Sequence, residues 1–231
     1  MKRTSIILLA LLLIPAGAFA ARPVSSFSAG RSLLATTSSP GNAYAAGASI
    51  VLTAPVSGDF SAIGGSIVSA APVSGDELLL GGSVSARAPV EGDFRAVGGT
   101  IVMEETVGGD LLAFGYSVES AGRVKGSVFV MAANTTLARG AVGPVTVYGN
   151  NVFLSGDFAG DVTIAASGRV ALGEDTVIRG ALRYESPEKA IIPASAIISG
   201  GVTYQSASYL PDVGTSRLLM LMSLGLFIFA R

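Results

Sequence analysis

The chain has 231 residues, of which 30 are glycine and half are hydrophobic, while only 13% are charged and the formal net charge is −1. It contains no cysteine, histidine or tryptophan, which excludes disulfide scaffolds, zinc fingers, iron–sulfur clusters and the Ser-His-Asp and Cys-His catalytic sites. Because there is no basic block, nucleic-acid binding has little electrostatic support. The glycine and small apolar residues are typical of close-packed, repetitive β-structure.

The first 20 residues have the three parts of a secretory signal peptide. Lys2 and Arg3 are basic, an apolar run covers residues 6–14, and residues 18–20 form an A-x-A cleavage site. The alternative is a retained membrane anchor, but this apolar run is too short to span a bilayer. We therefore predict cleavage before Ala21 and a location outside the cytoplasm. Residues 21–31 then form a leader ahead of the first domain.

A 17-residue repeat runs through the middle of the chain. Segments such as SIVLTAPVSGDFSAIGG, SIVSAAPVSGDELLLGG and SVSARAPVEGDFRAVGG follow one another from residue 49 without a gap, and the period lengthens to 20 near the end, with Gly180 and Gly200 as the equivalent glycines. The glycines that share one position are Gly41, Gly58, Gly75, Gly92, Gly109, Gly126, Gly143 and Gly160. We attribute them to tight corners, which need positive φ and leave no room for a Cβ atom.

Apolar residues recur in fixed columns of this repeat. Ile50, Ile67 and Val84 occupy one column, and Val56, Val73 and Val90 occupy another. Within a copy these residues alternate with Ser, Thr, Arg or Glu, which is the period of a half-buried strand. One copy, with about three short strands, cannot bury its apolar side alone, whereas stacked parallel copies can. The sequence therefore predicts an all-β, single-stranded parallel β-helix of about ten coils over residues 32–206. The irregular hexads favour a right-handed helix over the left-handed hexapeptide type.

The repeat also resembles a known family. The pattern V-x-G-D-x-x-A-x-G-G-x-[IV], at residues 56–67 and 90–101, is similar to the bactofilin-like, polymer-forming cytoskeletal repeat. Residues 178–205 look like the closing coils of secreted or membrane-anchored members. The resemblance covers residues 40–206. It implies a right-handed β-helix that assembles end to end without nucleotide into filaments or an envelope scaffold. A signal peptide departs from the strict, cytoplasmic bactofilins.

Aspartate recurs directly after the corner glycine, at Asp59, Asp76, Asp93, Asp110 and Asp161, with Asn42 at the head of the series. One interpretation is a calcium ladder, because stacked carboxylates supply hard oxygen ligands. The other is that each aspartate accepts hydrogen bonds from amides of its own turn. The repeat offers one such turn per coil, which favours the second interpretation, so we predict no metal site.

Glu77 interrupts an inward column, since it takes the place of Phe60 and Phe94 in the adjacent copies. A buried carboxyl group there would have a raised pKa and could act as an acid. We expect instead a local bulge that turns Glu77 to water. Asp76 is adjacent and faces the opposite side, while Glu104 and Glu105 are predicted to be solvated. No carboxylate pair supports a catalytic assignment.

The basic residues of the middle copies suggest a face for anionic glycans, or else a mixed, solvated surface. The acidic residues close by favour the mixed surface. The basic residues are Arg87, Arg95, Arg123, Lys125 and Arg139.

An apolar segment ends the chain. Residues 207–216 are predicted to be a linker, and residues 217–231 contain an apolar run from Leu218 to Ala230 between two arginines. As a helix, 13 residues extend only about 20 Å, less than the hydrocarbon core. Three alternatives remain: a transmembrane anchor, a sorting signal in which Leu210–Gly214 resembles L-P-x-T-G, and a helix that caps the solenoid.

The function predicted from these features is a non-enzymatic structural scaffold at the cell envelope, tethered to the membrane. Its expected partners are copies of itself, the membrane and cell-wall glycan, with no cofactor, nucleotide or nucleic acid. The alternatives are an adhesin or glycan-binding module, and a carbohydrate-active β-helix enzyme. The enzyme is disfavoured because the gap-free repeat leaves no long loops to build a cleft.

Overall fold

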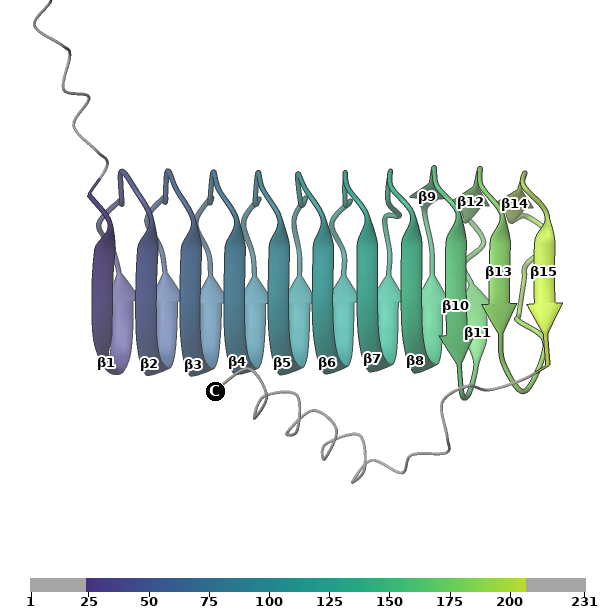
Figure 1. The fold of residues 1–231 in the computed structure, drawn as a ribbon, viewed down its shortest axis with the longest axis horizontal. Coiled ribbons are helices and arrows are strands. Elements are labelled where there is room, and N and C mark those ends of the chain that lie inside the picture. The colour runs from purple at the N-terminus through teal and green to yellow at the C-terminus, as the bar shows by residue number, and fades with distance from the viewer. Residues whose placement is uncertain (1–23, 207–231) are drawn as a thin grey trace, which may run out of the picture.

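A computed structural model describes residues 24–206 and shows a β-solenoid (Figure 1). Its main sheet follows the order β1-β2-β3-β4-β5-β6-β7-β8-β10-β13-β15, and every pair is parallel. The chain descends the near side of the rod, returns on the far side and advances along the axis, so the coils are right-handed (Figure 1). The predicted all-β solenoid is therefore confirmed.

The first eight coils each contain one ten-residue strand. These strands are β1 (Ser26–Ala35), β2 (Ala43–Leu52), β3 (Phe60–Ser69), β4 (Glu77–Ala86), β5 (Phe94–Met103), β6 (Leu111–Ser120), β7 (Val128–Leu137) and β8 (Val145–Leu154). Each strand folds back on itself near its middle, where residues such as Gly64 and Gly65 lie (Figure 1). We predicted three short strands per coil; the structure instead has this bent strand and a single bridge residue, such as Val56 paired with Val73.

The later coils have shorter strands: β9 (Asp157–Phe158), β10 (Val162–Ala166), β11 (Val170–Leu172), β12 (Val177–Ile178), β13 (Leu182–Glu185), β14 (Ile197–Ile198) and β15 (Val202–Gln205). The change of period has two local sources. Val152 pairs with Val170, an offset of 18, and Asp157 pairs with Val177, an offset of 20. The second step lies at the turn that ends at Thr176, whose buried hydroxyl group donates to the carbonyl groups of Gly173 and Leu154.

The solenoid is longer at its N-terminal end than the repeat predicted. β1 pairs in register with β2, from Ser26 opposite Ala43 to Ala35 opposite Leu52. The domain therefore begins near residue 26 and not at residue 32, and the main sheet has eleven strands in place of ten coils. The extra coil was missed because its inward residues are small or polar, such as Ser26 and Ser28, so its apolar columns are incomplete.

The core is the stack of inward columns, as predicted. Ile50, Ile67 and Val84 are buried, and so are Val56, Val73 and Val90. Within a strand, buried and accessible residues alternate on both sides of the bend. The alternation sends one half of each side-chain set inward, where residues of the same kind stack about 4.8 Å apart.

The repeating glycines are explained by close packing alone. Among the described residues, only Gly140, Gly156 and Gly201 have positive φ, so the predicted positive φ is wrong for the column from Gly58 to Gly126. A Cβ atom on Gly92 would collide with the Asp76 carboxylate and lie 2.7 Å from the backbone of Gly75. Each such glycine therefore makes room for the aspartate of the coil before it.

Candidate functional site

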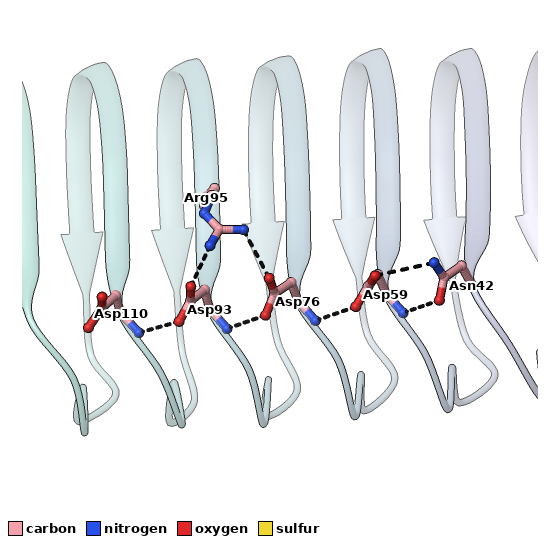
Figure 2. A network of polar contacts seen from close by, with 6 residues as sticks. All are labelled: Asn42, Asp59, Asp76, Asp93, Arg95 and Asp110. Carbon is pink, nitrogen blue, oxygen red and sulfur yellow. Dashed lines mark hydrogen bonds and ion pairs between the residues drawn. The ribbon is translucent and has the colours of Figure 1, made fainter.

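A row of aspartates follows one corner of the solenoid (Figure 2). The Oδ1 atom of Asp59 accepts a hydrogen bond from the backbone N–H of Asp76 at 3.0 Å, and Asp76 does the same for Asp93 at 2.9 Å. Asn42, Asp93, Asp110 and Asp161 repeat this contact with the next coil. The prediction that each aspartate bonds its own turn is therefore wrong in its partner, since the bond links successive coils.

Arg95 occupies the second carboxylate oxygens of this row. It donates to Asp76 Oδ2 at 2.9 Å and also pairs with Asp93 Oδ2 (Figure 2). The Asp93 amide and the Arg95 guanidinium lower the pKa of Asp76, against the opposing effect of partial burial. At Asp161 the amide of Ala181 and then Arg183 lower the carboxyl pKa in the same way. The row consequently uses its oxygens for hydrogen bonds between coils.

The described residues contain no group of three or more acidic side chains placed to hold a metal ion. This agrees with the use of the aspartate oxygens, although metal binding itself stays outside what the structure tests. In the same residues, 24–206, no helix is long and apolar enough to cross a membrane. The predicted signal peptide, and the apolar run from Leu218 to Ala230, lie outside the described residues.

Glu77 is fully enclosed, so the predicted bulge is wrong. Its side chain is 0% exposed, and neither carboxylate oxygen has a hydrogen-bond partner. Burial raises the pKa of Glu77 to about 7, and the nearby Ser69 hydroxyl opposes this only weakly. The strand pairs in unbroken register with its neighbours, Phe60 with Glu77 and Glu77 with Phe94. Turning Glu77 outward would shift the register and expose the rest of its coil.

The basic residues do not gather on one face. Arg95 lies on the first half of its strand and is held by Asp76 and Asp93, whereas Arg87 lies on the returning half of β4, 3.5 Å from Glu104. Arg123 pairs with Asp157 at 3.3 Å, and Lys125 and Arg139 are exposed. Glu104 and Glu105 are exposed as predicted. The structure therefore favours the mixed surface over a basic glycan-binding face.

The outward side of the first halves of β1–β8 is apolar, which the repeat analysis missed. We call this surface the apolar face. Its members stand at the second and fourth positions of each strand, where the analysis expected polar residues. The larger ones are Phe27, Tyr44, Ile63, Leu78, Leu80, Val97, Leu112, Phe114, Phe129, Met131 and Tyr148.

Aromatic contacts between strands order this face. The rings of Phe27 and Tyr44 stack at 4.8 Å, and Phe129 lies 5.9 Å from Phe114 and 5.8 Å from Tyr148. Arg95 is the one charged residue at these positions in β1–β8. The spacing of 17 between Ile63, Leu80, Val97 and Phe114 is a signal in the sequence that could have revealed this face.

In comparisons with known proteins, no family model matches the chain, and no match was found among curated proteins or solved structures. The resemblance to bactofilins therefore stays a prediction from the repeat.

Proposed function

We propose that the chain is a structural protein: a scaffold outside the cytoplasm whose solenoids join end to end and which residues 217–231 tether to the membrane. Assembly of this kind uses backbone hydrogen bonds and apolar stacking, so it needs neither a nucleotide nor another cofactor. The signal-like first 20 residues support the location, and the apolar run after residue 217 supports the tether.

The observation that carries the proposal is the pair of open sheet edges. Within residues 24–206, β1 pairs only with β2 and β15 only with β13. In β1 the amide of Ser26 donates to Asn42 and the carbonyl group of Ala35 accepts from Thr53. Because alternate residues of a parallel strand face opposite neighbours, the amides of Phe27 and Leu34 face the free edge. Such an edge is a template for another strand.

The described polar groups give little support to the enzyme alternative. Glu77 is enclosed among core side chains, and Asp76 and Asp93 are occupied by amides and by Arg95. A surface-binding module is the second candidate, and the observation that favours it is the apolar face, because exposed apolar surfaces of this extent mark interaction sites.

A proline at the free edge tests end-to-end assembly. Leu34→Pro removes the N–H group that faces the edge while leaving the bonds from β1 to β2 in place, so filaments should be lost. Leu34→Ala keeps this N–H group and should assemble like the wild type. Light scattering and negative-stain images of the full chain at tens of micromolar measure both variants. Loss of filaments in both variants, or in neither, would contradict the proposed edge contact.

A further inference from the structure

The apolar face is hollow at one end and raised at the other. Its fourth-position column runs Ala29, Ala46, Ile63, Leu80, Val97, Phe114, Met131 and Tyr148, so small side chains give way to large ones toward the C-terminal end. An open groove of about 480 Å³ lies over β1–β4, where Ala29, Ala46 and Ser61 stand beside Phe27, Ile63 and Leu80. The face is therefore a wedge and not a uniform plane.

We propose that a second copy of the chain covers this face, packed antiparallel about a twofold axis between β4 and β5, so that β1 of one copy opposes β8 of the other. In this arrangement Ala29 meets Tyr148, and Ala46 meets Met131. In the second-position column, Ser61 meets Leu112. Each small residue opposes a large one, and the raised half of each copy fills the groove of the other.

A parallel pair fits this face less well. With the two axes parallel, each strand meets its own counterpart, so the groove over β1–β4 faces the groove of the partner copy. The raised halves, with Phe114, Phe129 and Tyr148, would also face each other and hold the sheets apart. The antiparallel pair is self-complementary, as a twofold interface requires.

The size of the face argues for a whole sheet as its cover. Eight strands at about 4.8 Å and four residues at about 3.3 Å give about 500 Å² per copy, or about 1,000 Å² for the pair. This reaches the lower bound for a specific interface. A helix formed by the 13 residues after Arg217 would cover about 20 Å by 10 Å, which leaves more than half of the face exposed.

The charges at this interface are compensated. Arg95 lies on β5 beside the proposed axis, and its guanidinium is already paired with Asp76 and Asp93 of its own chain. The aspartate rows of the two copies lie on the same side of the pair, where each carboxylate accepts an amide bond of its own solenoid. Their mutual repulsion acts through solvent, so added salt should strengthen the pair.

Distance measurements between spin labels test the arrangement in the full chain. The chain has no cysteine, so Asn150→Cys, at the exposed turn of β8, provides one label per copy. Seven strand spacings separate the two labels of the antiparallel pair, which predicts about 35 Å. A parallel pair predicts less than about 20 Å, and end-to-end stacking alone predicts about 50 Å. Either of the last two results, without a population near 35 Å, overturns the proposal.

A charge on the apolar face provides the second test. Met131 is 41% exposed and lies on the face, whereas Phe153 is 40% exposed and lies on the returning half of β8. Met131→Glu should raise the dissociation constant of the pair at least tenfold in sedimentation runs, while Phe153→Glu should leave it unchanged. Equal effects overturn the proposal. A monomer in which Met131 is protected from oxidation also overturns it and assigns the face to the same chain's residues after 206.

These results are independent of end-to-end assembly. Single-width filaments that lack the label distance near 35 Å would leave the scaffold standing without the pair. Conversely, antiparallel pairs that do not lengthen would support this interface and contradict the scaffold. Filaments of double width, which Met131→Glu narrows to single width, are the result expected if both proposals hold.

Discussion

At the scale of single residues, Glu77 is the most costly group in the solenoid. A carboxyl group without a hydrogen-bond partner is stable inside a protein only in its neutral form. Its neighbours along the column, Phe60 and Phe94, offer no donor, and the strands on either side hold it inward. The coil therefore retains a group whose contribution depends on pH.

We predict that Glu77 makes the solenoid less stable as pH rises. The pKa rises from an ordinary 4.5 to about 7 in the folded protein, so between these values the folded chain holds a proton that the unfolded chain has released. The free energy of unfolding should fall by about 3 kcal/mol from pH 4.5 to pH 7 and then level off. Urea unfolding across this range measures it. Glu77→Gln should remove this slope, and equal slopes in the two proteins would contradict the assignment.

The aspartate row acts through acceptor atoms more than through charge, because Asn42 holds the same position with the same bond. Asp110 Oδ1 accepts the amide of Ser127 at 2.7 Å. Asp110→Ala should lower the free energy of unfolding by about 1 kcal/mol, whereas Asp110→Asn keeps an acceptor and should lose much less. Thermal melts of both variants decide this. If asparagine costs as much as alanine, the charge and not the acceptor is what matters.

At the scale of elements, each coil is a bent strand followed by a bridge residue, and both depend on inward apolar side chains. Val90 is 3% exposed and bridges Val73 and Val107. Val90→Asp should therefore cost about 3 kcal/mol or more at neutral pH, because it places a second unpaired carboxylate in the core.

Circular-dichroism melts measure the effect of Val90→Asp. The outward neighbour Glu91 supplies the matched control, since Glu91→Gln should melt like the wild type. A melt of Val90→Asp that does not change would show that this segment can turn its side chain to water.

The columns of the coil could be predicted from the sequence, because stacking repeats one environment every 17 residues. Three features could not. The enclosure of Glu77 depends on register across both neighbours, the partner of each aspartate depends on which amide the corner presents, and the bend replaces two of the expected strands. The apolar face was visible in residues such as Leu80 and Phe114, but a search for inward columns does not read the outward ones.

At the scale of the whole molecule, the solenoid is nearly one-dimensional. In the main sheet each strand pairs with the strand of the coil before it and of the coil after it, so stability is a sum over coils and their shared interfaces. The register from β2 to β8 keeps the offset of 17, for example from Phe60 to Glu77 and on to Phe94. A coil should thus be removable as a unit.

Deletion of residues 77–93 tests this property. It removes one complete coil, joins Asp76 to Phe94 and places Phe94 against Phe60, so every inward column and the aspartate row continue. We expect a shorter solenoid that folds, and that is more stable at pH 8 than the wild type because Glu77 has gone. Deletion of residues 77–92 is the matched control. It leaves Asp93 opposite Phe60, which shifts the register by one residue and turns the inward side chains of the next strand to solvent. Circular dichroism and urea unfolding should show a folded 17-residue deletion and an unfolded or strongly destabilised 16-residue deletion. Similar behaviour of the two deletions would mean that stacking tolerates a slipped register, and that coils do not act as units.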